Sequence, residues 1–342
     1  MKAAVVHAPG DIRIEDRPDP QVRARTDAIV RVDLTCVCGT DLWIWRGQAP
    51  YEAGQSIGHE FVGTITDTGP DVRLRPGTRV IAPFAWSDGT CNACRRGLHT
   101  SCGNGGFWGT PGADGAQGEA VRVPYADATL VAVPDGTDTA ILPALLALSD
   151  ILPTAYHAVT LARVRPRDHV IIVGDGPVGL LTVQAARRAQ AGRISLIGHH
   201  PERHALARHY GATDTHTDDQ PVLPDMDSGS LADTAIDCVG TASSYRTCLA
   251  AVRDGGRIAM VGVPYTLRSI SPEPLFNRNI TFRPGVTPAR TYIPRLLPHV
   301  LAGSLDPTGV FDTPVALSGL STAYHAMATR TGVKPLINPH RT

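Results

Sequence analysis

The stretch His169-Val-Ile-Ile-Val-Gly-Asp-Gly-Pro-Val-Gly179 decides the fold. It begins with an apolar run of strand length, and its glycines then fit the pattern G-x-G-x-x-G before a helix-like segment, 178–191. In this pattern the first glycine permits a tight turn, the second lets the backbone approach a pyrophosphate, and the third lets helix and strand pack closely. Plain strand-to-helix turns also carry such glycines, but this strand and helix context indicates a dinucleotide site. The expected cofactor contacts in the turn are Gly174, Gly176, Pro177, Val178 and Gly179.

The segments after this turn continue the same alternation of strand and helix. Strand-like runs lie at 193–197, 234–237 and 256–262, and a helix-like run lies at 202–210. A repeated β-α-β order of this kind predicts a doubly wound parallel sheet. We therefore expect a Rossmann dinucleotide-binding domain over residues 152–285.

The residues on either side of this domain differ from it in composition and in the spacing of their apolar residues. Residues 1–151 are dense in glycine and proline, with short β-branched runs between turn signals, which is typical of an irregular, mostly-β domain. Residues 286–342 are too short to fold alone, so we expect them to return to the first domain. The predicted fold class is α/β, with a mostly-β domain plus the doubly wound sheet, and a length of 342 residues also favours two domains.

The charge balance limits the partners. The chain has 32 basic and 32 acidic residues, so nothing in its net charge favours nucleic acid or an anionic membrane surface, and a small molecule is the expected partner. The apolar start is too short for a signal peptide and is interrupted by Pro9 and Gly10. The longest apolar stretch, 140–152, is shorter than a membrane span. We expect a soluble, cytoplasmic protein.

A catalytic zinc site is indicated by Cys38-Gly-Thr-Asp41 and Gly58-His-Glu60. A catalytic zinc takes three protein ligands from sulfur, nitrogen and oxygen donors and keeps a fourth position for water or substrate. Cys38 and His59 supply two ligands, and Asp150, which ends an apolar run at the domain change, is our choice for the third. Asp150 suits the N-cap of the following helix equally well. Glu60 is either a fourth, transient ligand or a supporting carboxylate, and Asp41 is expected to accept the other N–H of His59.

A second cluster of metal-binding residues lies in the segment 87–102. Three thiols in a short loop would oxidise if they were exposed and unliganded, so they indicate a structural zinc. A closed site needs four ligands, for which Asp88 is the best candidate and His99 its competitor. The expected set is Asp88, Cys91, Cys94 and Cys102.

The choice of cofactor depends on the residues after the second strand. An NAD site normally places Asp or Glu about 20 residues beyond the glycines, where it binds the ribose 2′-hydroxyl. Gly198 stands there instead, and basic side chains follow it, so NADP is favoured over NAD. A solvated loop and helix start is the alternative interpretation. The expected cofactor contacts outside the glycine turn are Gly198, His199, His200, Arg203, Val239 and Lys334.

Taken together, these motifs resemble the zinc-dependent alcohol dehydrogenases of the medium-chain dehydrogenase/reductase superfamily over nearly the whole chain. The resemblance implies a GroES-like catalytic domain and a Rossmann domain, with Cys38, His59 and Asp150 as catalytic zinc ligands. It also implies that Thr40 is the hydroxyl of a proton relay and that the chain forms a homodimer or homotetramer. The matching motifs, in the family's order, are Cys38 to Asp41, Gly58 to Gly63, the cysteine loop, Gly174 to Gly179 and Gly211 to Asp214.

Three positions depart from the family's pattern. Asp88 replaces the first of four structural cysteines, which predicts a less tightly held second zinc. Trp43 stands where many members carry a histidine that passes the proton to solvent, and Gly198 replaces the ribose-binding acid as it does in NADP-linked relatives. Trp43 and Trp108 are therefore candidates for the substrate pocket, although each suits a plain core position equally well. Phe107 and Trp108, near several glycines, are expected to be the most exposed of the candidates.

The leading hypothesis from the sequence is an oxidoreductase that transfers hydride between an alcohol, secondary by the resemblance, and NADP, or reduces the corresponding ketone or aldehyde. A second hypothesis is reduction of a C=C or C=N bond in a biosynthetic intermediate, which the missing relay histidine keeps open. A third is a catalytically silent, nucleotide-binding regulator. The intact set of Cys38, Thr40, His59 and Asp150 argues against the third, because zinc-free relatives without dehydrogenase activity lose it.

Overall fold

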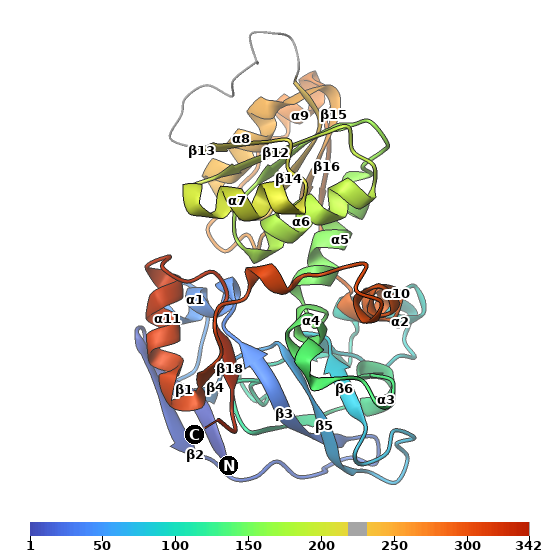
Figure 1. The fold of residues 1–342 in the computed structure, drawn as a ribbon, viewed down its shortest axis with the longest axis vertical. Coiled ribbons are helices and arrows are strands. Elements are labelled where there is room, and N and C mark those ends of the chain that lie inside the picture. The colour runs from blue at the N-terminus through green and yellow to red at the C-terminus, as the bar shows by residue number, and fades with distance from the viewer. Residues whose placement is uncertain (218–230, 342) are drawn as a thin grey trace. The chain divides into compact units, whose positions relative to one another are not determined.

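The computed structural model describes residues 1–217 and 231–341 (Figure 1). The chain divides into two compact units, Met1–Pro153 with Pro288–Thr342, and Thr154–Thr287. The sequence predicted boundaries after residues 151 and 285, two residues before each of these.

Most strands of the first unit pair antiparallel, but β17 and β18 pair in parallel. The largest sheet of this unit has the order β10-β6-β5-β3-β18-β17. Strand β9 pairs with the first four residues of β3, Ala28 to Arg31. A second sheet has the order β2-β1-β4, and β7 pairs with β8. The strands are β1 (Lys2–Ala8), β2 (Asp11–Asp16), β3 (Ala28–Cys36), β4 (Gln55–Ser56), β5 (Phe61–Thr68), β6 (Arg79–Ala82), β7 (Ala85–Trp86), β8 (Gly106–Phe107), β9 (Ala120–Val123), β10 (Val131–Ala132), β17 (Val315–Ala316) and β18 (Leu336–Asn338).

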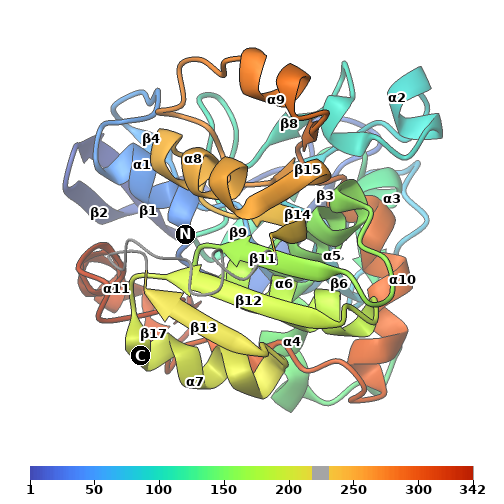
Figure 2. The same cartoon turned by 90° about the horizontal axis from the view of Figure 1, so that it is seen from above.

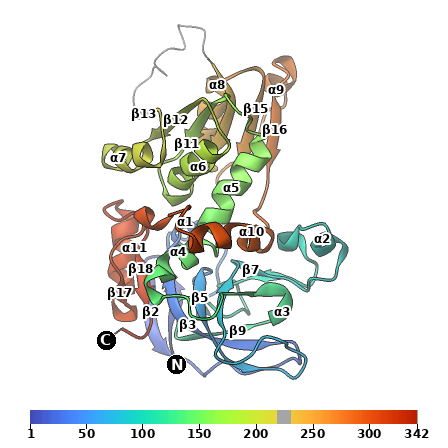
Figure 3. The same ribbon diagram turned by 45° about the vertical axis from the view of Figure 1, so that its right-hand side comes forward.

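The C-terminal residues return to this unit. Strand β18 pairs antiparallel with β3, with Leu336 opposite Cys36. Helix α10 packs against α4 and β10, and α11 packs against β17. Figure 3 shows α10 beside α4 and α11 beside β17. The helices are α1 (Gly39–Trp45), α2 (Asn92–Arg95), α3 (Ala126–Thr129), α4 (Leu142–Ala147), α10 (Ala289–Leu301) and α11 (Leu320–Ala328), with 3-10 turns η1 (His99–Ser101), η2 (Thr139–Ile141), η4 (Thr308–Val310) and η5 (Leu317–Gly319).

The second unit is a six-stranded parallel sheet of order β13-β12-β11-β14-β15-β16. Helices α6 and α7 cover one face and α8 the other (Figures 1 and 2). The strand order reverses between β11 and β14, and such a switch point is where doubly wound sheets bind ligands, at the carboxyl ends of the strands. The elements are α5 (Ile151–Ala162), β11 (His169–Val173), α6 (Pro177–Arg188), β12 (Arg193–Gly198), α7 (Pro201–Tyr210), β13 (Asp214–Thr217), β14 (Ala232–Asp237), α8 (Ala242–Ala251), β15 (Val252–Met260), α9 (Glu273–Asn277) and β16 (Thr281–Pro284).

The two units confirm the predicted fold class, a mostly-β domain plus a doubly wound parallel sheet. Local sequence explains the turn at the switch point. Gly176 is the N-cap of α6, Pro177 fills the first helical position, where a missing N–H costs nothing, and Arg187 and Arg188 lie at the negative end of the helix. Gly211 ends α7 with a φ of 114°, a left-handed conformation that favours glycine.

Among the residues that the structure describes, one helical segment, Thr139–Ala162, is long and apolar enough to cross a membrane by length and composition. It joins η2, α4 and α5 into 24 residues, so it extends beyond the apolar run 140–152 noted in the sequence. Within its most apolar window, 61% is buried inside the structure, as in the core helix of a soluble protein. The segment is therefore weak evidence for a membrane span.

Candidate functional site

The first unit brings Cys38, His59, Glu60 and Asp150 together, with one potential ligand atom from each within 4.8 Å of the others. His59 Nε2 lies 3.5 Å from Asp150 Oδ2 and 3.8 Å from Glu60 Oε1. Cys38 Sγ lies 3.9 Å from Asp150 Oδ2. The cluster therefore contains the sulfur, nitrogen and oxygen donors that a zinc ion accepts together.

Local structure explains how residues so far apart in sequence meet. Cys38 is the N-cap of α1, and its backbone N–H donates to Asp41 Oδ2 in the first turn of that helix at 2.9 Å. His59 and Glu60 immediately precede β5, whose first residue, Phe61, pairs with β3. Asp150 lies in the turn between α4 and α5, and its carboxylate reaches His59 and Cys38.

A hydrogen-bonded chain orients the imidazole of His59. Its Nδ1 lies 3.0 Å from Asp41 Oδ1, while the other carboxylate oxygen of Asp41 accepts from Gln117 Nε2 at 3.1 Å. The Tyr324 hydroxyl donates to Gln117 Oε1 at 2.9 Å, so the returning tail supports the same chain. With Nδ1 held by Asp41, Nε2 faces the cluster, and the Thr40 hydroxyl lies 3.1 Å from it.

Burial and charge shift the protonation of this cluster. Burial raises the pKa of the Cys38 thiol. Burial alone would lower the pKa of His59, but the Asp41 carboxylate and Cys38 outweigh it and raise that pKa well above its usual range. The environment of the imidazole is thus strongly negative, as a site that attracts a cation requires.

Lys334 joins this cluster through Glu60. It is fully buried, and its Nζ donates to Glu60 Oε1 at 2.6 Å and to the Val37 carbonyl at 3.5 Å. Burial raises the pKa of Glu60, and the Lys334 ammonium opposes that rise. The expected role of Lys334 as a cofactor contact stays a prediction. Its contact with Glu60 spans 274 residues, so no local pattern could have found it.

Glu60 supplies the strongest test of metal fit. Its Oε2 is buried and has no hydrogen-bond partner among the described residues, although Oε1 is paired. A buried carboxylate oxygen without a partner is costly, and a cation beside it would satisfy it. Together with the thiol and imidazole donors, this oxygen fits a zinc ion at the cluster.

The cysteine loop forms a second cluster in the same unit. Asp88, Cys91, Cys94 and Cys102 each place a potential ligand atom within 4.8 Å of the others. Asp88 Oδ1 accepts the backbone N–H groups of Thr90 and Cys91 at 2.8 and 3.0 Å, and these bonds hold its pKa well below the usual range. Burial raises the pKa of Cys94 to about 12. The ionised carboxylate beside three sulfurs has the composition of a closed metal site.

His99, the competing fourth ligand, is not in this cluster. Its Nδ1 lies 3.1 Å from the Thr291 hydroxyl at the start of α10. Burial is the main cause that lowers its pKa, and nearby Arg290 adds to it. Of the two alternatives left open by the sequence, the structure brings Asp88 and not His99 to the sulfurs.

The second unit holds the glycine turn at the end of β11. Gly174 has a φ of 111°, and a Cβ on it would lie 2.7 Å from Val239 Cγ2 in the loop after β14. A Cβ on Gly179 would collide with the Gly174 carbonyl oxygen. Val178 and Gly179 lie in the first turn of α6, where backbone N–H groups have no partner within the helix. This cradle, open at a helix N-terminus, fits a pyrophosphate.

At the end of β12, the side chain of Asp175 lies over Gly198. A Cβ on Gly198 would lie 2.5 Å from both Cγ and Oδ2 of Asp175, so the space over Gly198 is filled by that side chain. Asp175 Oδ2 accepts the His200 backbone N–H at 2.7 Å, and His200 Nδ1 lies 2.9 Å from Oδ1. Arg203 Nη1 donates to the Asp175 carbonyl at 3.4 Å, while His199 is exposed.

Asp175 is the residue that the sequence analysis missed. It stands between the first two glycines of the G-x-G-x-x-G pattern, a position that carries no fixed residue type, and it is 5% exposed. A carboxylate inside a turn that is expected to face phosphates was the available signal. The structure gathers the expected His200 and Arg203 around it.

The two tryptophans proposed for the substrate pocket differ. Trp108 is 3% exposed, its Nε1 donates to the Pro83 carbonyl at 2.8 Å, and its ring packs against Phe61 and Trp86. It lies in the core of the first unit, so the expectation that it is exposed was wrong. Tertiary packing, which glycine-rich flanking sequence does not reveal, buries it. Trp43 is partly buried on α1, one turn after Thr40.

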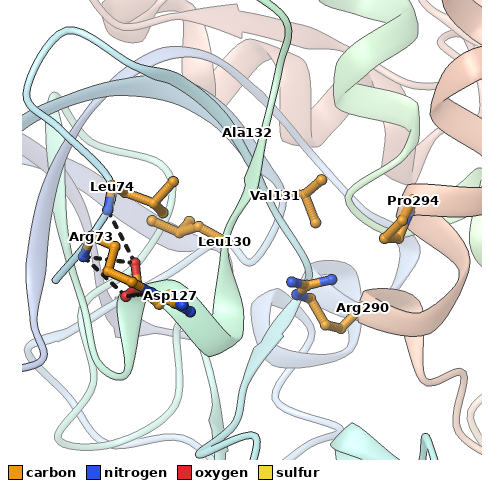
Figure 4. A pocket seen from close by; sticks show the side chains of 8 residues that line it. All are labelled: Arg73, Leu74, Asp127, Leu130, Val131, Ala132, Arg290 and Pro294. Atoms are coloured by element: carbon orange, nitrogen blue, oxygen red, sulfur yellow. Dashed lines mark hydrogen bonds and ion pairs between the residues drawn. The ribbon is translucent and has the colours of Figure 1, made fainter.

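A pocket of about 330 Å³ lies elsewhere in the first unit (Figure 4). It contains none of the residues of either metal cluster. Its lining comes from the loop before β6, from α3 and β10, and from the start of α10. The lining residues are Arg73, Leu74, Asp127, Leu130, Val131, Ala132, Arg290 and Pro294.

Comparison with known proteins agrees with this geometry. Residues 24–135 match the model of the alcohol dehydrogenase GroES-like domain, and residues 177–301 match that of the zinc-binding dehydrogenase. An alcohol dehydrogenase of Cupriavidus necator is 32% identical, with 99% of each chain covered. The alcohol dehydrogenase TADH from Thermus sp. ATN1 superposes with a TM-score of 0.92 at 30% identity, over 99% of each chain. A zinc-binding dehydrogenase structure from Sinorhizobium meliloti bound to NADP has a TM-score of 0.83 at 25% identity, again over 99% of each.

The fold and the two clusters define a zinc-binding oxidoreductase of the α/β type. The chain belongs to the zinc-dependent alcohol dehydrogenase family of the medium-chain dehydrogenase/reductase superfamily, as the resemblance in its motifs had indicated.

Proposed function

We propose that this protein catalyses reversible hydride transfer between a secondary alcohol and NADP, using a zinc ion held by Cys38, His59 and Asp150, with Glu60 as a ligand that exchanges. The observation that carries the proposal is the convergence of these four side chains, including the buried, unpartnered Glu60 Oε2. When bound, zinc would supply a Lewis acid that stabilises negative charge on the substrate oxygen.

Side chains of the protein would orient the zinc ligand His59 and carry the proton away from the substrate. Asp41 holds His59 in one orientation through Nδ1 at 3.0 Å. The Thr40 hydroxyl, 3.1 Å from His59 Nε2, is placed to take the proton of a substrate hydroxyl and pass it outward. Trp43 occupies the position where many relatives continue the relay with histidine, so water or the cofactor ribose would carry the proton further.

NADP as the cofactor is supported by two features. Gly198 ends β12 without a carboxylate of its own, although the Asp175 carboxylate lies over it. His199, and His200 and Arg203 beside Asp175, follow it with potential donors to a 2′-phosphate. A related structure was solved with NADP. The pyrophosphate would be held by Val239 and by the residues of the glycine turn, which are Gly174, Gly176, Pro177, Val178 and Gly179.

The test combines metal content, cofactor binding and turnover. The wild-type chain should contain about two zinc ions, one for each cluster, and should oxidise NADPH with ketones and not only with enals or imines. Cys38→Ser and Asp150→Asn should abolish turnover and remove one zinc while leaving NADPH binding measured by fluorescence nearly unchanged. Full activity in a chain shown to be metal-free would overturn the mechanism.

The same assay addresses the reductase alternative. The observation that favours it is Trp43 in the relay position, which weakens the link to simple alcohol oxidation. Turnover of enals or imines with no turnover of ketones would assign the chain to C=C or C=N reduction. We also propose that the protein is cytoplasmic and forms a homodimer or a homotetramer, two assemblies that light scattering of the purified chain would distinguish.

A further inference from the structure

Arg290 lines the pocket of Figure 4 without an anionic partner. Its Nε donates to the Ala128 carbonyl at 2.9 Å. Within residues 1–217 and 231–341 it forms no ion pair at 4.0 Å or less. The side chain is partly buried, and burial lowers the pKa of Arg290. Arg290 also lies in the first turn of α10, where the helix end adds partial positive charge.

The other charged groups of the pocket are already matched. Asp127 accepts the backbone N–H groups of Arg73 and Leu74 at 3.0 and 3.1 Å and the Arg73 Nε at 3.2 Å. Figure 4 shows these bonds, and none of them leads to Arg290. Asp127 is thus the counterion of Arg73. The pocket as a whole keeps one uncompensated positive charge, on the guanidinium of Arg290.

Apolar side chains form the remaining wall. Leu74, Leu130 and Val131 come from the neighbouring loop and strand, and Pro294 lies one turn along α10 from Arg290. Leu130 is only 2% exposed and belongs to the folded core, and the partly buried Leu74 packs against that core. At about 330 Å³ the pocket is at the lower end of the range of about 300–1,000 Å³ typical of small-molecule sites.

We propose that this pocket is a second ligand site, separate from the metal clusters, which binds a small organic carboxylate. The guanidinium of Arg290 binds the carboxylate, for which its planar array of donors is well suited. The short aliphatic or aromatic body of the ligand packs on the wall of Leu74, Leu130, Val131 and Pro294. A neutral amide of the same shape lacks the charge and binds much more weakly.

The test is calorimetric titration of the full-length, zinc-loaded protein with butyrate and benzoate, in a buffer free of carboxylate. Butyramide and benzamide are the neutral comparators, and inorganic phosphate tests for an anion without an apolar body. Saturable binding of the carboxylates is expected, weakened about tenfold or more in Arg290→Met. Arg295→Met is the matched control, because Arg295 is exposed on the same helix and does not line the pocket.

Thermal unfolding without ligand shows whether Arg290→Met is folded, and Arg290→Lys retains the charge if it is not. A ligand that binds the folded chain should raise the unfolding midpoint of wild type and Arg295→Met, but not of Arg290→Met. Equal binding of acids and amides, or equal weakening by both substitutions, overturns the proposal. So does a change of assembly mass in Arg290→Met without carboxylate binding, because a second copy of the chain would then fill the pocket.

Discussion

Gly198 has no room for a side chain while Asp175 keeps its position. A Cβ there would lie 2.5 Å from Asp175 Cγ and Oδ2, and the carboxylate is held in place by the backbone and ring of His200. We expect Gly198→Ala to lower the free energy of unfolding by about 1–3 kcal/mol, as overpacking does. Urea denaturation of the cofactor-free chain measures it.

Two further variants test whether a steric clash causes the loss of stability in Gly198→Ala. Asp175→Ala introduced with Gly198→Ala should recover part of the loss, because it removes the atoms that the new methyl group meets. Gly176→Ala should have a smaller effect, since a Cβ there meets nothing within 4 Å. Equal losses in the single and double variants would argue against a direct clash between the two positions.

Lys334 and Glu60 form a pair in which neither side chain is more than 1% exposed. Removing the ammonium leaves a buried carboxylate without its counterion, so Lys334→Met should cost about 3 kcal/mol or more of unfolding free energy. Lys2→Met is the control, because Lys2 is the only other lysine, and its ion pair with Asp16 is exposed to solvent and contributes little to stability. Adding Glu60→Gln to Lys334→Met should restore stability; similar losses in the two lysine variants would contradict the buried-pair argument.

At the scale of elements, Asp127 on α3 fixes the loop at residues 73 and 74, because its carboxylate accepts hydrogen bonds from the two backbone N–H groups there. Burial alone would raise the pKa of Asp127, but the backbone N–H groups of Arg73 and Leu74 outweigh it and lower that pKa. A carboxyl whose pKa is lower in the folded chain contributes stability above its unfolded pKa of about 3.9 and loses that contribution as the pH falls through the folded value.

Asp127→Asn should therefore destabilise the chain by about 1 kcal/mol at neutral pH, and the difference from wild type should shrink below about pH 4. Urea unfolding across the range from about pH 3 to pH 7 gives the comparison. The exposed Asp135→Asn is the matched control. A difference that stays constant down to the lowest pH would show that the carboxylate charge is not the cause.

Elements whose signals are local were predictable from the sequence. The expected strand 193–197 is β12 (Arg193–Gly198), and the expected helix 202–210 is α7 (Pro201–Tyr210), because hydrophobic runs and a terminal glycine mark them. Contacts between distant segments were not predictable. The pairing of Lys334 with Glu60, the burial of Trp108 and the filling of the space over Gly198 each depend on side chains that meet only in the folded unit.

On the scale of the whole molecule, both metal clusters lie in the first unit, and none of their residues lies in the second. Metal ligands that converge only on folding make metal binding part of the folding free energy. Removal of metal by a chelator should therefore loosen the first unit and leave the parallel sheet of the second nearly unchanged. Hydrogen exchange followed by mass spectrometry resolves the two units in one experiment.

Exchange should rise in the cysteine loop, around 88–102, and around 38–41 and 59–60, while β11, β12 and β14 keep their protection. Cys91→Ser, which touches one cluster only, should raise exchange in the loop and spare 38–41. Re-addition of zinc should reverse the change in wild type. Equal loosening of both units after verified zinc loss would mean that the metals stabilise the chain as one cooperative body, whereas unchanged exchange everywhere would mean that the clusters fold without them.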